Sequence, residues 1–262
     1  MVCLDEGGRG RRAVRLLAPP ANLDPWVEHF FIQVRSVADR GLWRVVPDAC
    51  SHVIFSVANG EPRCRLVGSR RSFRDIDTSG RHVTLGARLR PGALPHLTRC
   101  AADEFTDGSF PMEDVFGAPG RDLGARMGEK TPIDALRDLE RFLSARLDHC
   151  EPDPRFERAL RLAGSVDAAA EMLNVSLRTF RTRALKVTGL APKRVLRLGR
   201  LYRALRFGAM PRPIWSDIAW RAGYADQAHM VREFRSLVGD SPERWRRRAS
   251  ADSFNTRPAQ MR

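Results

Sequence analysis

Apolar residues follow two different periods along this chain, and the change of period divides it. In residues 14–92 they recur close to every second position, which is typical of strands that bury one face. The clearest case is 82–89, where Val83, Leu85 and Ala87 alternate with polar residues. The same pattern predicts strands at 42–46, 51–57 and 63–67. One helix is expected in this region, at 25–32. We expect a small antiparallel β-barrel or β-sandwich, cupin-like in scale, with flanking helices.

Helical spacing replaces this alternation from about residue 93 onward. Short helices are expected at 93–128. A longer helix begins where Thr131 caps the chain, with Pro132 at the first helical position and Asp134 at the third. An apolar stripe runs along it: Ile133, Leu136, Leu139, Leu143 and Leu147. The stripe allows two interpretations, burial against its own β-domain or an antiparallel helix pair across a homodimer.

A short segment of two acids and two prolines, EPDP at 151–154, separates the two regions. Its prolines end one helix, and Asp153 can begin the next. We therefore expect a two-domain α+β protein. Its parts are a disordered basic tail at 1–12, a sensory or dimerisation domain at 13–150, an all-α domain at 151–249 and a flexible tail at 250–262.

The all-α region opens with a helix-turn-helix pattern at 166–189. Asn174 stands at the turn, where it tolerates left-handed backbone better than most residues, and Ser176 is a good cap for the next helix. The inward positions of that helix are Leu177, Phe180, Ala184 and Val187. The outward positions are Arg178, Arg181 and Thr182, which suit a helix lying in a major groove, where arginine reads guanine edges.

A second pattern at 216–239 repeats the first. Gly223 takes the turn, and Asp226 caps a helix whose inward positions are Met230, Phe234 and Leu237. Outward lie Gln227, Ala228, Val231 and Arg232. Glutamine suits adenine, arginine suits guanine, and alanine or valine can touch a thymine methyl group, so this face also predicts base contacts.

A long helix at 192–207 joins the two patterns, with Val195, Leu198, Tyr202 and Leu205 on its apolar side. At about 1.5 Å per residue it can hold the two outward faces about one DNA turn apart. We expect the helix cap Ser176 and the linker residues Arg194 and Arg197 to contact DNA phosphates.

This region resembles the DNA-binding domain of the AraC/XylS family of transcription regulators, over roughly residues 154–248. The resemblance is carried by LRTFR at 177–181, TGLAPKR at 188–194, DIA at 217–219, GYADQ at 223–227 with His229, REFR at 232–235 and SP at 241–242. It implies base contacts from Arg178, Arg181 and Thr182 in the first unit, and from Gln227, Ala228, Val231 and Arg232 in the second.

Two positions depart from the family pattern. The family usually has phenylalanine where this chain has Ala184, and an apolar residue where it has Gly199. Phe180, where leucine is commoner, is expected to fill the space that Ala184 leaves. The segments at 46–55, 86–92 and 111–116 resemble an N-terminal domain often fused to such regulators, whose ligand is generally unassigned.

Charge is distributed unevenly. The formal net charge is +14, with 23 Lys and Arg against 11 Asp and Glu in residues 151–262, and 22 against 20 in residues 1–150. The basic excess therefore belongs to the region with the helix-turn-helix patterns, as binding to phosphates requires. The expected partners are double-stranded DNA and RNA polymerase, with a small-molecule effector and a second copy of the chain as further candidates.

The sequence gives little sign of catalysis or metal binding. Its five cysteines, at 3, 50, 64, 100 and 150, form no CxxC pair, and this argues against a zinc site or a disulfide framework. His52, His82 and His96 lack the HxH…E spacing of cupin enzymes. Asp48, Arg88 and Arg90 could line an effector pocket or form structural ion pairs. We expect no enzyme, cofactor or metal, and a cytoplasmic protein without a membrane span; the alternative is a cupin-like enzyme domain fused to a DNA-targeting module.

Overall fold

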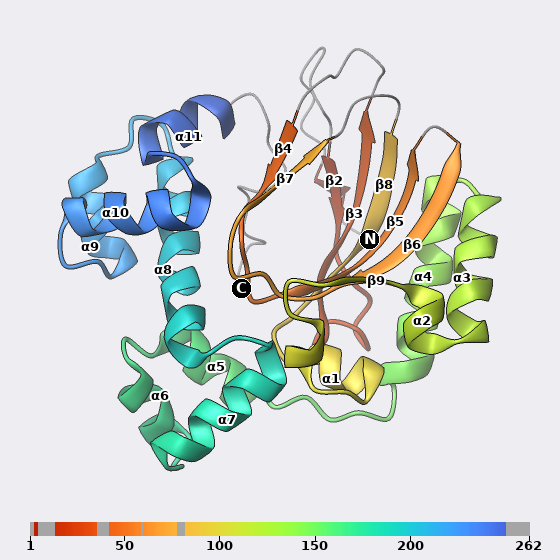
Figure 1. The fold of residues 1–262 in the computed structure, drawn as a ribbon, viewed down its shortest axis with the longest axis horizontal. Coiled ribbons are helices and arrows are strands. Elements are labelled where there is room, and N and C mark those ends of the chain that lie inside the picture. Colours follow the sequence, from red (N-terminus) through yellow and green to blue (C-terminus); the bar gives the residue numbers. More distant parts are fainter. Residues whose placement is uncertain (1–2, 5–13, 36–41, 59, 78–81, 250–262) are drawn as a thin grey trace.

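The computed structural model describes residues 3–4, 14–35, 42–58, 60–77 and 82–249. An antiparallel β-sheet domain comes first and an all-helical domain follows, with α8 as the long rod between the outer helices (Figure 1). The predicted fold class, a two-domain α+β protein, is confirmed. Most of the predicted tails lies outside the described residues, but Cys3–Leu4 forms a short strand, β1, where the sequence predicted disorder.

Seven strands form the main sheet, in the order β1-β2-β3-β8-β5-β6-β9, and all neighbours are antiparallel. A second, two-stranded antiparallel sheet pairs β4 with β7, which are separated in the sequence by β5 and β6. In the described part of the chain the two sheets are not joined into a closed barrel. The strands are β2 (Val14–Leu17), β3 (Val27–Arg35), β4 (Leu42–Val45), β5 (Ser51–Ala58), β6 (Glu61–Val67), β7 (Arg74–Asp77), β8 (His82–Leu89) and β9 (Ser109–Pro111).

Four of these strands, β4, β5, β6 and β8, lie where the alternation predicts them. The helix predicted at 25–32 is wrong, because residues 25–26 lie in a turn and the strand β3 begins at Val27. β3 lies between β2 and β8, and Phe30, Phe31 and Ile32 are all buried, so both of its faces are covered. A strand covered on both faces has a continuous apolar run, which periodicity does not distinguish from a buried helix.

Helices α2 (Met112–Phe116), α3 (Ala118–Gly128) and α4 (Pro132–Leu147) pack against the sheet, and α3 and α4 stand beside it in Figure 1. The short helix α1 (Ala93–Thr98) contacts α4 and the later helix at 177–188, and the 3-10 helix η1 (Ala102–Phe105) contacts that same later helix. Leu85, Ala87 and Leu89 of β8 point into the core beneath them, as their alternation predicts. The apolar stripe of α4 joins the same core, so within the chain the stripe is buried against its own domain.

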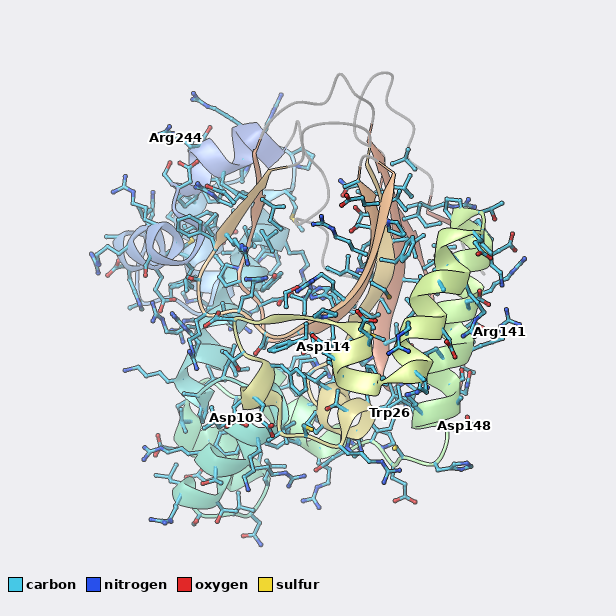
Figure 2. The ribbon with its side chains drawn as sticks, turned by 45° about the vertical axis from the view of Figure 1, so that its right-hand side comes forward. Trp26, Asp103, Asp114, Arg141, Asp148 and Arg244 are labelled. Carbon is cyan, nitrogen blue, oxygen red and sulfur yellow. The ribbon has the colours of Figure 1, made fainter. Side chains whose placement is uncertain are left out.

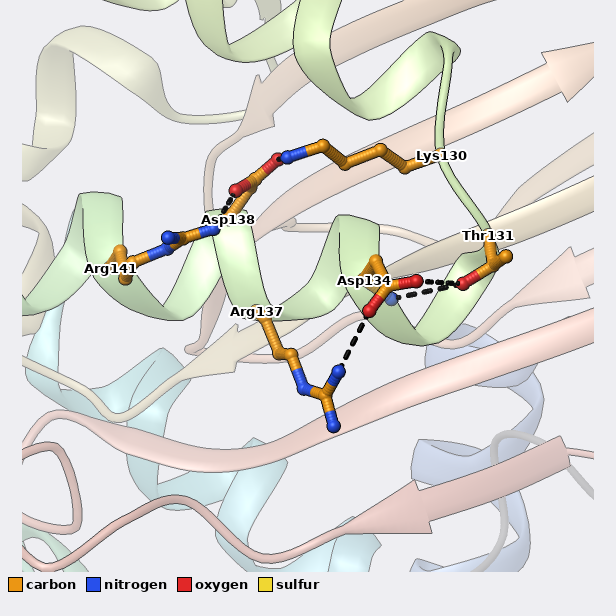
Figure 3. A network of polar contacts seen from close by, with 6 residues as sticks. All are labelled: Lys130, Thr131, Asp134, Arg137, Asp138 and Arg141. Carbon is orange, nitrogen blue, oxygen red and sulfur yellow. Dashed lines mark hydrogen bonds and ion pairs between the residues drawn. The ribbon is translucent and has the colours of Figure 1, made fainter.

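The outer face of α4 is polar (Figure 3). Thr131 caps the helix by accepting a hydrogen bond from the backbone N–H of Asp134, as the sequence predicts. Asp138 is buried, and its carboxylate accepts from Lys130 Nζ at 2.6 Å and also pairs with Arg141. A partner that docks on this face of α4 would therefore meet charged side chains already paired with one another.

The second domain contains seven helices among the described residues: α5 (Pro154–Leu162), α6 (Val166–Met172), α7 (Leu177–Thr188), α8 (Pro192–Gly208), α9 (Trp215–Ala222), α10 (Gln227–Val238) and α11 (Pro242–Ala249). The segment between α4 and α5 holds residue 151, where the sequence predicts the domain boundary. No helix of the described ranges is both long and apolar enough to cross a lipid bilayer.

Candidate nucleic-acid interface

The first helix-turn-helix unit consists of α6, a tight turn and α7. Asn174 occupies the turn with φ of 54°, in the left-handed region, as its position predicts. Ser176 Oγ accepts a hydrogen bond from the backbone N–H of Thr179 at 3.1 Å and so caps α7. Phe180 and Ala184 are fully buried, whereas Leu177, predicted to face inward, is exposed because it begins the helix beyond the core.

Phe180 occupies the space near Ala184. Its ring lies 5.9 Å from the ring of Phe156 on α5, centroid to centroid, and both residues are almost completely buried. The structure thus places a large aromatic side chain beside the small Ala184, as the sequence predicts for this departure from the family pattern.

The predicted base-contacting residues of α7 are all exposed: Arg178, Arg181 and Thr182. Within the described ranges neither Arg178 nor Arg181 forms an ion pair, whereas Arg183, two positions beyond Arg181, pairs with Asp153. An arginine without a carboxylate partner is available to an incoming base or phosphate. The exposed face of α7 therefore has the chemistry that a major-groove contact needs.

The second unit, α9 and α10, has the same construction. Gly223 takes the turn with φ of 88°, and Asp226 Oδ1 accepts from the backbone N–H of His229 at 2.6 Å, so both predicted positions are confirmed. Met230 and Phe234 are fully buried. The outward residues are exposed except for Val231, which is half-buried: Gln227, Ala228, Val231 and Arg232.

The linker helix α8 holds the two units together through buried apolar and charged contacts. Its apolar side contributes Val195, Leu198 and Leu205 to the core, as predicted. Glu233 of α10 accepts from Arg197 Nε at 2.6 Å and from Arg200 Nη2 at 3.2 Å. The role of Glu233 was not predicted from the sequence, although an acid at a buried position of α10 is a signal that a cation lies opposite.

The three residues predicted to contact phosphate lie in different surroundings. Ser176 is exposed at the start of α7, where free backbone N–H groups point outward. Arg194 is half-buried near the N-terminal domain, and burial lowers the pKa of its guanidinium. Arg197 uses Nε for Glu233, which leaves its other guanidinium nitrogens for a further partner.

Arg88, considered for an effector pocket, lies in a buried ion-pair cluster of the β-domain. Its Nε lies 2.5 Å from Glu28 Oε2, and its Nη1 lies 2.7 Å from Asp48 Oδ2. Burial raises the pKa of Asp48 to about 6, against the lowering effect of the Arg88 charge. Arg90 pairs with Glu157 of the second domain and with Asp24. The structure therefore favours ion pairs at these positions.

Two histidines flank Arg88 across the sheet. His29 of β3 and His52 of β5 are both in register with Arg88 of β8. Burial, then the charge of Arg88, lowers the pKa of His29 to about 4 and that of His52 to about 3, so both are neutral near pH 7. No three His, Cys, Asp or Glu residues of the described part of the chain form a group that could hold a metal ion.

The other histidines considered as ligands lie elsewhere. His96 of α1 packs its ring 4.8 Å from that of Trp26, centroid to centroid. The side chain of His82 lies outside the described residues. The structure thus does not bring His52 and His96 into one ligand set.

A groove of about 360 Å³ lies at the seam between the domains, lined by Trp26, Arg90 and His96 on one side and by Phe156 and Arg183 on the other. Trp26 and Phe156 are each only 3% exposed, so their rings offer little surface to a ligand. The charged groups that line it are already paired: Arg90 with Asp24 and Glu157, and Arg183 with Asp153.

Comparison with known proteins agrees with this construction. Residues 169–248 match the family described as "Helix-turn-helix domain", and residues 15–111 match "Domain of unknown function (DUF6597)". The HTH-type transcriptional activator RhaS of Escherichia coli (strain SE11) is 37% identical over 76 residues, which are 29% of this chain and 27% of RhaS. The chain thus matches about a quarter of the length of this curated relative.

Solved structures with similar topology include ToxT from Vibrio cholerae O395, with 9% identity and a TM-score of 0.42 over 82% of this chain and 95% of ToxT. CdpR from Pseudomonas aeruginosa has 17% identity and a TM-score of 0.32 over 64% of this chain and 46% of CdpR. Both TM-scores are below 0.5, so the two likenesses are weak. The two capped helix-turn-helix units, their motif residues and the family match show that residues 169–248 form a helix-turn-helix domain of the AraC/XylS type.

Proposed function

We propose that the chain reads a specific DNA sequence by placing α7 and α10 in successive major-groove segments. The observation that carries this proposal is that two separately capped helices present exposed polar side chains and are joined by the rod α8. With 17 residues, α8 spans about 25 Å, and with α7 and α10 attached beyond its ends the two helices can lie about one DNA turn, roughly 34 Å, apart.

Each outward residue has a proposed partner on the DNA. Arg178, Arg181 and Arg232 donate to guanine edges, and Gln227 suits adenine. Thr182 suits a base edge through its hydroxyl group, and Ala228 and Val231 suit thymine methyl groups. Ser176, Arg194 and Arg197 are proposed to contact phosphates, which fix the register of the protein on the duplex.

The N-terminal domain is proposed to bind a small effector or to mediate dimerisation, and so to alter DNA affinity or the contact with RNA polymerase. The groove at the domain seam is one candidate place for an effector, because a molecule there would touch both domains. A homodimer through α4 would have to use its charged outer face, since the apolar stripe is buried. The relative named as a transcriptional activator supports a role in transcription. Since the proposed partner is DNA, we place the action in the cytoplasm.

Selection of bound duplexes from a random pool tests this proposal on the full chain. We expect wild-type protein to enrich a motif with two parts, one for each reading helix. Arg232→Ala should relax the preference at one position of the second part, and Arg181→Ala at one position of the first, each at a cost of about 1–3 kcal/mol. Full discrimination by Arg232→Ala would show that the base-reading assignment is wrong.

A further inference from the structure

Both reading helices end in the same way and in contact with the same domain. α7 ends at Gly189 and α10 at Gly239, 50 residues apart, and both glycines adopt the left-handed conformation, with φ of 76° and 73°. The carbonyl oxygen of each glycine accepts a hydrogen bond from a side chain of the N-terminal domain. Thr106 donates to the first and Arg44 to the second.

At the first contact, Thr106 Oγ1 lies 2.7 Å from Gly189 O. Backbone and side chain are packed closely here: a Cβ atom on Gly189 would lie 2.4 Å from Thr106 Oγ1 and 2.6 Å from Ser69 Oγ. Thr106 follows η1, and η1 packs against α7. In Figure 2, Asp103 marks η1, which lies beside the first helix-turn-helix unit.

At the second contact, Arg44 of β4 points its guanidinium at the last turn of α10. Its Nη1 lies 3.3 Å from Val238 O and 3.4 Å from Gly239 O, where a cation is favoured by the free carbonyl groups of a helix end. Asp75 of β7 holds the opposite edge of Arg44 through two hydrogen bonds of 2.7 and 2.6 Å. The ring of Phe73 lies 4.4 Å below the guanidinium and leaves no room for a Cβ atom on Gly239.

The rod between these two contacts is weakened at its middle. Gly199 lies inside α8, where glycine is a poor helix former. Space does not require glycine at this position, because a Cβ atom would meet only Arg203 Nη1, at 3.7 Å. With alanine at this position α8 would be a more stable helix and would hold the two helix-turn-helix units more rigidly. With glycine, other contacts must contribute to the relative position of the two units.

We propose that Thr106 and Arg44 are positioning residues: through them the N-terminal domain holds the C-terminal ends of both reading helices and sets their separation and angle. This inference rests on the proposed DNA reading. DNA and the N-terminal domain use opposite ends of the same helices, because Arg178 and Gln227 lie exposed in the first turns of α7 and α10. Both contacts can therefore exist at once, and a movement of η1 or of the β4-β7 pair changes the spacing that the protein reads.

The test measures spacing selectivity in the full chain. Four duplexes carry the two parts of the selected motif at different spacings: the selected spacing, one base pair shorter, one base pair longer and two base pairs longer. The affinity of the protein for each duplex is measured. Wild-type protein should bind the selected spacing at least about tenfold more tightly than the others, because both helices engage only when the geometry allows it. Thr106→Val and Arg44→Met should flatten this profile and leave the affinity for each isolated half unchanged.

Two further variants make the result specific. Arg63→Gln removes an exposed ion pair with Glu61 on β6 and should keep the wild-type profile. Gly199→Ala stiffens α8, so its addition to Arg44→Met should restore part of the spacing preference. A wild-type profile in both Thr106→Val and Arg44→Met would overturn the positioning role of Thr106 and Arg44.

Amide hydrogen exchange without DNA distinguishes failure of the positioning role from failure of the proposed function. The last turns of α7 and α10 should exchange faster in Thr106→Val and Arg44→Met, respectively, than in wild type. Unchanged exchange in these turns would overturn the positioning role whatever the DNA measurements show. If wild-type protein binds every duplex alike while exchange does rise in the variants, the failure lies in the proposed DNA reading, and the positioning role falls with it.

Discussion

At the scale of single residues, the half-buried row His29–Arg88–His52, which crosses β3, β8 and β5, contributes to the pH response of the β-domain. Arg88 stays charged between Glu28 and Asp48, and the two histidines beside it stay neutral. Sequence alone identified Arg88 and Asp48 as either pocket residues or ion pairs. The choice depends on Glu28, which is 60 residues away from Arg88 and reaches it only through the pairing of β3 with β8.

Acidification should destabilise the protein, and His29→Gln should weaken that effect. The pKa of His29 is about 4 in the folded chain and about 6.5 when unfolded, so between these values only the unfolded chain takes up the proton. The contribution of His29 to the free energy of unfolding is therefore fully present above pH 6.5. It is lost as pH falls from 6.5 towards 4, by up to about 3 kcal/mol. His52 acts in the same direction. Asp48 opposes them, because its raised pKa favours the folded state as pH falls from 6 towards 4.

Urea unfolding at pH 7.5 and pH 5 measures this difference. Wild-type protein should lose more free energy of unfolding between the two values than His29→Gln does, because glutamine does not titrate. His149→Gln, at an exposed position after α4, is the matched control and should behave as wild type. Equal losses in wild type and His29→Gln would contradict the assignment of a neutral, half-buried His29.

At the scale of elements, local signals predicted most of the helical domain. Asn174, Ser176, Gly223 and Asp226 each act on the backbone within a few residues, so their positions alone predict the turns and caps that form. The strand β3 has no such signal, because its burial depends on neighbours distant in the sequence. Thr106 and Arg44 have none either: they contact carbonyl groups 83 and 195 residues away.

The core of the first helix-turn-helix unit gives a prediction at this scale. Ala184→Phe should destabilise the protein by about 1–3 kcal/mol, because Phe180 and Phe156 already fill the space around a fully buried alanine. The double variant Phe180→Leu with Ala184→Phe restores the arrangement more common in the family and should be more stable than Ala184→Phe alone. Thermal unfolding of the two single variants and the double variant gives the coupling energy. Additive effects would show that the two side chains do not share one space.

At the scale of the whole molecule, the positive charge of the helical region and its contacts with the N-terminal domain together determine the surface left for DNA. The helical region carries most of the net charge, and the N-terminal domain contacts the C-terminal ends of α7 and α10, opposite to their exposed first turns. Many arginines of α8 already have protein partners, as Arg200 with Glu233 and Arg203 with Ala222 O. The basic surface that remains for phosphate is therefore smaller than the composition suggests, and the salt dependence of DNA binding can measure it.

Arg197 and Arg200 form a matched pair for that measurement. Both donate to Glu233 Oε1, but the side chain of Arg197 is 27% exposed and that of Arg200 is 19% exposed. Arg197→Gln should weaken binding to all duplexes alike and reduce the slope of log affinity against log salt by about 0.9, the contribution of one phosphate contact. Arg200→Gln loses a contact with the same carboxylate and should keep the wild-type slope. If both variants keep the wild-type slope, Arg197 contacts Glu233 and no phosphate. If both variants reduce the slope equally, the change comes from movement of α10, because Glu233 is the contact that the two arginines share.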